Sequence, residues 1–182
     1  MKKLSFAVMV TLLSIFFFGE NVQAQSSSGD QFMFQTKRLI KSASNLTDAD
    51  KLALEDIKWS NVRMHFDFTN RFKGATNIQI SSEDYSYLIS CATDGGFNRA
   101  TYSRKGRWER TIRTYPNEKL DETIRANIKY AYPRFSIFGS VTEVKSGNET
   151  AQLVTIEDQK TWKRIKVVDG ELEVYEEYRK SR

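Results

Sequence analysis

The sequence contains very few of the residues from which disulfide frameworks, metal centres and catalytic triads are built. Its 182 residues include one cysteine and one histidine. A single thiol excludes a disulfide within the chain and a cysteine-based zinc site, and a single imidazole argues against a histidine-centred metal site or triad. The nucleophile-elbow, zinc-protease and P-loop motifs are missing as well. We therefore expect a protein that is not an enzyme and that carries no cofactor or metal.

Two features leave alternatives open. The neighbouring carboxylates Glu176 and Glu177 fall in a predicted strand, where adjacent side chains point to opposite faces, so they do not converge on one substrate. A carboxylate pair assembled from distant strands stays possible on sequence grounds. Cys91 is expected to be a small buried strand residue, and an intermolecular disulfide is the alternative.

Only one long hydrophobic run is present, and it lies at the N-terminus. The run Leu4–Phe18 follows Lys2 and Lys3 and precedes the small-residue site that ends at Ala24. This order is typical of a secretory signal peptide over residues 1–24. The run is shorter than the roughly 20 residues that a membrane-spanning helix needs. We therefore expect export to the periplasm or beyond, without stable membrane insertion after cleavage.

The composition is that of a globular protein with a moderate excess of positive charge. There are 28 Lys and Arg residues against 23 Asp and Glu, with 40% hydrophobic residues and a pI near 9.2. A pI in this range suits nucleic-acid binding, but an exported protein seldom meets nucleic acid. We expect an acidic protein or another envelope component as the partner, and no nucleic acid.

An N-terminal extension over residues 25–59 is expected to be partly helical. Thr47 and Asp50 have the form of a capping box that opens a helix through Ile57. A shorter helix is expected over residues 30–42. The apolar positions that suggest it are Phe32, Phe34, Leu39 and Ile40.

The first repeated unit is expected over residues 60–116. A helix from Ser60 to Gly74 is predicted by an apolar stripe at helical spacing, with His65 as a partly exposed helix residue beside it. Four antiparallel strands follow, because the apolar period changes to two and turn signals occur at Asp94–Gly96 and Arg104–Gly106. The residues of the predicted stripe are Val62, Phe66, Thr69 and Phe72.

The second unit, residues 117–182, repeats this order. A helix through Leu120 and Ile128 ends at Pro133, since proline cannot continue it. Four strands are predicted over residues 136–145, 150–157, 161–168 and 171–178. The repeat of about sixty residues is weak in identity but consistent in element order.

The sequence segments at the ends of these helices and in two hairpins resemble the PepSY-like family of exported bacterial proteins, whose fold is similar to that of the β-lactamase-inhibitor protein. The resemblance implies an α+β fold in which two tandem units, each one helix plus a four-stranded antiparallel meander, form one curved sheet with helices on one face. It also implies an exported, non-enzymatic protein, and some relatives of the fold bind or inhibit proteins. It carries over no site residues. The segments are Phe72–Ile78, Ala100–Tyr102, Ile128–Pro133 and Val167–Gly170.

Hairpin geometry predicts which charges lie together on each face. A two-residue loop at Asp169–Gly170 pairs Lys166 with Glu173 and Arg164 with Tyr175, so this hairpin neutralises its own exposed face.

The first unit does not neutralise itself in this way. A three-residue loop over Arg104–Gly106 places Tyr102 opposite Trp108 on the core side. Between Phe97 and Tyr115 there are six basic residues and one acidic residue. The candidate partner-binding residues on the outer face and at the loop tip are Phe97, Arg99, Arg104, Lys105, Arg107 and Arg113.

The leading hypothesis is a binding module that contacts a protein through the helix-free face of the sheet. Three alternatives stay open. The charges serve only solubility and protect an edge strand; the protein carries a small ligand in a pocket lined by Tyr87, Tyr102 and Trp108; or it is a structural part of the envelope that docks a neighbour through residues 30–58. The sequence leaves the oligomeric state open.

Overall fold

The computed structural model describes residues 46–181. The signal peptide expected over residues 1–24 and the helix expected over residues 30–42 lie outside the described residues.

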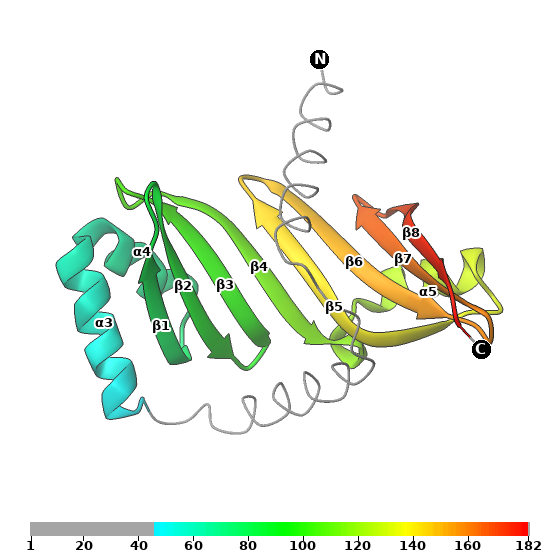
Figure 1. The fold of residues 1–182 in the computed structure, drawn as a ribbon, viewed down its shortest axis with the longest axis horizontal. Helices are drawn as coiled ribbons and strands as arrows, with labels where there is room; N and C mark the ends of the chain where they lie inside the picture. The colour runs from blue at the N-terminus through cyan, green and yellow to red at the C-terminus, as the bar shows by residue number, and fades with distance from the viewer. Residues whose placement is uncertain (1–45, 182) are drawn as a thin grey trace, which may run out of the picture.

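The fold is a single antiparallel sheet with helices against one side of it (Figure 1). Its eight strands neighbour one another in chain order, from β1 at one edge to β8 at the other. The strands are β1 (Thr76–Ser82), β2 (Ser86–Thr93), β3 (Gly96–Ser103), β4 (Trp108–Pro116), β5 (Ser136–Ser146), β6 (Glu149–Glu157), β7 (Thr161–Val168) and β8 (Glu171–Arg179). The helices are α3 (Asp48–Ser60), α4 (Val62–Arg71) and α5 (Glu122–Ala131), with a short 3-10 helix η1 (Asn117–Lys119).

The expected division into two tandem units of one helix plus four strands is wrong. β4 and β5 pair through seven residue pairs, from Arg110–Ser146 to Pro116–Ser140, so the sheet runs without interruption across the expected boundary. The helices are also unequally distributed, since α3 and α4 both precede β1 and only α5 lies between β4 and β5. One continuous sheet was expected, so the error concerns the helices: the repeated local pattern reports strand and turn order but does not fix how many helices accompany each half.

The start of α3 has the capping box that the sequence predicts, and it also ties the helix to the sheet. The Asp50 N–H donates to Thr47 Oγ1 and the Thr47 N–H donates to Asp50 Oδ2, each at 3.2 Å. The other oxygen of Asp50 accepts the backbone N–H of Ile78 in β1 at 2.8 Å. Burial alone would raise the pKa of Asp50, but the hydrogen bonds from Ile78 and Thr47 outweigh it and hold the pKa below its usual value.

α4 turns a different stripe toward the sheet from the one that the sequence predicts. Met64 and Phe68 are buried, whereas Val62 and Phe66 are exposed, so the predicted stripe through these two residues is wrong. Polar contacts from Asp67 to β3 hold α4 in this rotation. The sequence offers two overlapping apolar stripes here, and a long-range contact selects between them.

The apolar core on the helix side is divided into two clusters. The first gathers Ile57, Met64 and Phe68 over β2 and β3, and the second gathers Ile128 and neighbours over β5 to β7. Between them lie three polar side chains of β4 and β5, those of Thr111, Arg113 and Glu143. We call these three residues the polar seam.

Cys91 lies in β2 and is fully buried within the first cluster, as the sequence predicts. Burial raises the pKa of its thiol to about 12, so the thiol stays protonated and unreactive near neutral pH.

Candidate functional site

The side of the sheet opposite α3, α4 and α5 is the candidate site, and we call it the helix-free face. No helix within residues 46–181 packs on it, and in Figure 1 α4 and α5 lie behind the strands. Strand pairing defines its central cross-strand row. That row runs through Ser90, Arg99, Ile112, Val144 and Ala151.

The helix-free face carries a small apolar cluster of its own. Val144 and Leu153 are 9% and 4% exposed, and Ile112 and Tyr175 pack against them. A sheet face that meets only water normally alternates to polar side chains. The apolar cluster therefore distinguishes this face from an ordinary solvated one.

Two of the predicted site residues, Phe97 and Arg99, lie on this face in β3. Arg99 is exposed and Phe97 is partly exposed. Arg99 stands directly between Ser90 of β2 and Ile112 of β4, so its guanidinium borders the apolar cluster.

Arg113, in contrast, lies on the helix side of the sheet. Tyr102 pairs with Trp108 as predicted, but Thr101 pairs with Arg110, because Glu109 is the extra residue of a β-bulge. A one-residue shift moves every later side chain of β4 to the other face. The expected place of Arg113 on the outer face is therefore wrong.

Arg113 is held firmly where it lies. Its Nη2 donates to the carbonyl of Gly95 at 3.1 Å, and its Nη1 lies 3.9 Å from Glu143. Its guanidinium is also 4.9 Å from the ring centre of Tyr115. Through these contacts Arg113 connects the β2–β3 turn to Glu143 of β5.

Arg110 lies on the helix-free face instead, opposite Thr101, and Thr114 takes the place opposite Phe97 that was expected for Arg113. Arg110 Nε donates to Thr101 Oγ1 at 3.3 Å, and burial lowers the pKa of its guanidinium. The sequence held a signal for this shift. Strict alternation from Trp108 would put Arg110 into the core, which is costly for a charge, whereas a bulge moves it outward.

The turn between β3 and β4 holds the other three predicted residues. Arg104 donates to Ser82 Oγ at 2.8 Å and to the carbonyls of Glu83 and Asp84, and its guanidinium lies 4.9 Å from the Tyr87 ring centre. It therefore fastens the β1–β2 turn. Lys105 and Arg107 are exposed at this end of the sheet.

The second half of the helix-free face neutralises its own charge. Lys166 pairs with Glu173 at 3.3 Å, as predicted. Arg164 pairs with Glu176 at 2.9 Å rather than lying opposite Tyr175, because a second bulge interrupts the β7–β8 register.

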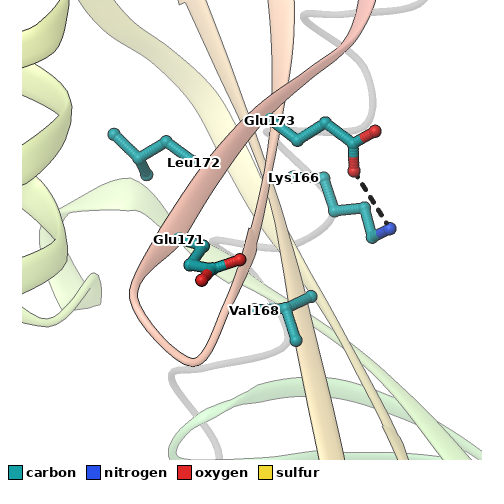
Figure 2. A pocket seen from close by; sticks show the side chains of 5 residues that line it. All are labelled: Lys166, Val168, Glu171, Leu172 and Glu173. Carbon is teal, nitrogen blue, oxygen red and sulfur yellow. Dashed lines mark hydrogen bonds and ion pairs between the residues drawn. The ribbon is translucent and has the colours of Figure 1, made fainter. Parts of the chain in front are cut away.

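A hollow of about 290 Å³ lies beside this hairpin, and the Lys166–Glu173 ion pair forms part of its wall (Figure 2). Its lining residues are Lys166, Val168, Glu171, Leu172 and Glu173. Two of the charged groups in this wall, Lys166 and Glu173, are already paired with each other within the hairpin.

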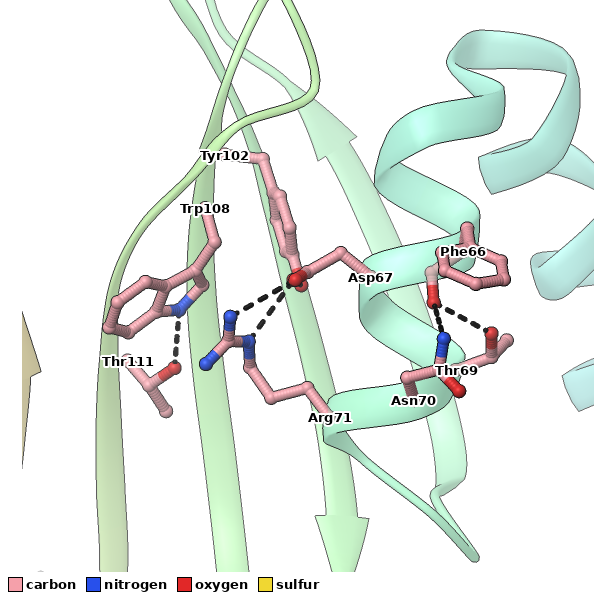
Figure 3. Close-up of polar contacts among 8 residues, drawn as sticks. All are labelled: Phe66, Asp67, Thr69, Asn70, Arg71, Tyr102, Trp108 and Thr111. Carbon is pink, nitrogen blue, oxygen red and sulfur yellow. Dashed lines mark hydrogen bonds and ion pairs between the residues drawn. The ribbon is translucent and has the colours of Figure 1, made fainter. Parts of the chain in front are cut away.

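A second polar cluster lies on the helix side, between α4 and the β3–β4 hairpin (Figure 3). The hydroxyl of Tyr102 donates to Asp67 at 2.8 Å, and Arg71 donates to both oxygens of Asp67 at 3.1 and 3.0 Å. The Arg71 guanidinium lies 4.2 Å from the Trp108 ring centre, and the Trp108 N–H donates to Thr111 at 2.9 Å.

The groups of this cluster do not change their protonation near neutral pH. Burial alone would raise the pKa of Asp67, but hydrogen bonds from Arg71 and Tyr102 hold it below its usual value. Burial and the neighbouring Asp67 raise the pKa of Tyr102. The carboxylate stays ionised and the phenol stays protonated, so the cluster fastens α4 to the sheet and is not tuned for proton transfer near pH 7.

Replacing Tyr102 by phenylalanine should lower the free energy of unfolding by about 1–2 kcal/mol, because a buried hydrogen bond to a charged acceptor is lost while Arg71 still pairs with Asp67. Urea unfolding at pH 7 measures the change. Tyr130→Phe, at an exposed position of α5, is the control and should leave stability unchanged. Equal stability of the Tyr102 variant and the control would contradict this role for Asp67.

Within the part of the chain that the structure describes, no three His, Cys, Asp or Glu side chains are arranged to hold a metal ion. Over the same residues, no helix has the length and apolar character required to cross a membrane.

Comparison with known proteins yields structural neighbours only. No family model matches the chain, so the PepSY-like resemblance is not confirmed, and no curated protein matches it. Several solved structures of Bacteroides proteins are similar to this chain. A DUF2874 family protein of Bacteroides ovatus has 14% identity and a TM-score of 0.49, with 64% of this chain and 85% of that chain covered.

Two further structures are similar to this chain. A Bacteroides eggerthii protein assigned provisionally to the periplasm has 14% identity and a TM-score of 0.47, covering 64% of this chain and 86% of its own. A BLIP-like protein of Bacteroides fragilis has 17% identity and a TM-score of 0.49, covering 65% of this chain and 85% of its own. The course of the backbone is thus similar to that of DUF2874 and BLIP-like proteins, at a level that carries no functional argument.

Proposed function

We propose that the chain is an exported, non-enzymatic binding module that contacts an acidic protein through its helix-free face. One observation carries the proposal. Arg99 is exposed in the middle of β3, beside the apolar cluster, on a sheet face that no helix within residues 46–181 covers.

The charge distribution supports an acidic partner. Among the ion pairs within residues 46–181, none includes Arg99, Lys105 or Arg107. On the second half of the same face, Arg164 and Lys166 are paired with glutamates. Positive charge without an internal counter-ion is therefore concentrated over β3 and its turn, where it can steer and align an acidic surface.

The apolar cluster supports contact rather than mere solubility. Charges that only keep a sheet edge soluble need no apolar neighbours. Here Arg99 lies next to the partly exposed Ile112, whereas Val144 and Leu153 on the adjoining strands are already buried by their neighbours. The apolar surface open to a partner is therefore that of Ile112 and Tyr175, and apolar groups beside polar ones are usual in a protein interface.

The small-ligand alternative gains no support from the residues on which it depended. Tyr102 is fully buried and bonded to Asp67, Tyr87 lies beneath Arg104, and Trp108 lies beneath Arg71. These rings pack against protein groups. The export component of the proposal depends on the sequence of residues 1–24.

A charge reversal at Arg99 tests the proposal. The mature protein and its Arg99→Glu variant are each immobilised and incubated with envelope extract, and the recovered proteins are quantified by mass spectrometry. We expect Arg99→Glu to recover about tenfold less of the partner, since a negative charge placed against an acidic surface costs at least about 1.4 kcal/mol.

Lys129→Glu is the matched control. Lys129 is exposed on α5, on the other side of the sheet, and the substitution changes the net charge by the same amount. Recovery should be preserved in this variant. Equal recovery of the same proteins by wild type and Arg99→Glu would rule out the helix-free face as the contact surface.

A further inference from the structure

A strip of large apolar side chains is exposed on the outer side of α3 and α4. Leu52 and Trp59 are 69% and 83% exposed, and Val62 and Phe66 are 71% and 72% exposed. We call these four residues the outer strip. Exposed apolar groups scattered singly are ordinary, but a contiguous set marks a contact surface.

Helix geometry places the outer strip away from the sheet. Leu52 and Trp59 are seven residues apart, so they share one face of α3, opposite the buried Ile57. Val62 and Phe66 are one turn apart on α4, opposite Met64 and Phe68. Figure 3 shows Phe66 on the far side of α4 from Asp67, which points to the sheet. The helix-free face and the outer strip are therefore separate surfaces.

The chain itself supplies an apolar segment of suitable length next to this strip. Residues 30–42 precede α3 and are joined to its N-cap, Thr47, by four residues. At about 1.5 Å per residue, a helix of this segment would be about 20 Å long, the same as the thirteen-residue α3. A short connection of this kind favours antiparallel neighbours.

The side chains of the segment are complementary to the outer strip. At helical spacing Phe32, Leu39 and Ile40 fall on one side. The other side carries Phe34 and the basic residues Lys37, Arg38 and Lys41. On α3 the exposed carboxylates of Glu55 and Asp56 flank the line from Leu52 to Trp59. Apolar positions can thus face apolar positions, with opposite charges along the sides.

We propose that residues 30–42 form a helix that packs antiparallel to α3 and covers the α3 part of the outer strip, Leu52 and Trp59. In this register Leu39 lies near Leu52 and Phe32 lies near Trp59, because the chain reverses between residues 43 and 47. The segment completes a helical layer on the side of the sheet away from Arg99. The packed segment leaves the helix-free face accessible. This packing does not depend on whether the proposed partner binds.

Hydroxyl-radical footprinting of the mature chain tests this packing. Oxidation of Trp59 is compared between the wild type and a Phe32→Asp/Leu39→Asp variant. We expect oxidation of Trp59 to be about threefold faster in the variant, because docking should reduce its large exposed fraction to about a quarter. Tyr85 and Tyr130, both highly exposed elsewhere, are internal references and should not change.

A disulfide measurement tests the register. In a Cys91→Ala background, Leu39→Cys combined with Leu52→Cys should form an intramolecular disulfide, since this requires the two Cβ atoms to lie within about 4.5 Å. Arg38→Cys combined with Leu52→Cys is the matched control, because position 38 points about a quarter-turn away.

Each outcome bears on the proposal. Faster oxidation in the Asp variant, with a disulfide only for the position 39 pair, supports it. Equal and fast oxidation of Trp59 in both chains would overturn it. Protection that persists in the Asp variant and depends on protein concentration would also overturn it, in favour of a second copy on the outer strip.

Discussion

Replacing Asp50 by alanine should lower the free energy of unfolding by about 3 kcal/mol, which is a large part of the stability of an ordinary domain. Asp50 is only 2% exposed and joins two elements through one carboxylate. Its loss removes the cap of α3, worth about 1 kcal/mol. It also leaves the buried N–H of Ile78 without its acceptor, which costs about 1–3 kcal/mol.

The same carboxylate makes part of the stability depend on pH. The pKa of Asp50 is lower in the folded protein than in the unfolded chain, where it is about 3.9. Its stabilising contribution is therefore complete above the unfolded value and is lost as the pH falls toward the folded value. The difference in stability between the wild type and Asp50→Asn should shrink below about pH 4.

Urea unfolding at pH 7 and at lower pH measures both effects. Asp48→Ala is the control, because Asp48 is exposed in the same helical turn and pairs only with Lys51. It should cost no more than about 0.5 kcal/mol. A similar loss in the two alanine variants would show that the bond to Ile78 contributes little.

Gly96→Ala should destabilise the fold by about 3 kcal/mol or more. The backbone φ of Gly96 is +137°, a value that residues with a side chain rarely adopt. An added Cβ would lie 2.3 Å from the carbonyl oxygen of Thr114 in β4, so backbone must move. Strain and overpacking each cost about 1–3 kcal/mol.

Gly147→Ala separates these two causes. Gly147 also has a positive φ, of +57°, but nothing lies within 4 Å of the added Cβ. This variant should lose only about 1 kcal/mol, the cost of the left-handed backbone. Thermal or urea unfolding of the two variants measures the difference. Equal losses would mean that the contact with Thr114 relaxes at no cost.

Local sequence patterns predicted much of the order of elements but not how the faces are occupied. Asp94 and Gly95, within the first turn signal, and Asp169–Gly170 lie between the observed strands, and the capping box at Thr47 is confirmed. The bulges in the β3–β4 and β7–β8 pairs escaped prediction, because each depends on packing across strands. One bulge was enough to move Arg113 to the helix side and Arg110 to the helix-free face.

The rotation of α4 shows the same limit. Val62 and Phe66 form as good an apolar stripe as Met64 and Phe68, so helical periodicity alone cannot choose between them. The choice depends on Asp67, whose partner Tyr102 is 35 residues away in sequence. The equivalence of the two halves failed for a related reason, since similar local patterns do not fix how many helices cover each half of the sheet.

The polar seam has a consequence for how the protein tolerates change. Because Thr111, Arg113 and Glu143 stand between the two apolar clusters, a substitution in one cluster is transmitted to the other mainly through the backbone ladder of β4 and β5. Each cluster can then vary in side-chain volume with little adjustment in its neighbour. Substitutions placed in the two clusters should therefore change stability nearly additively.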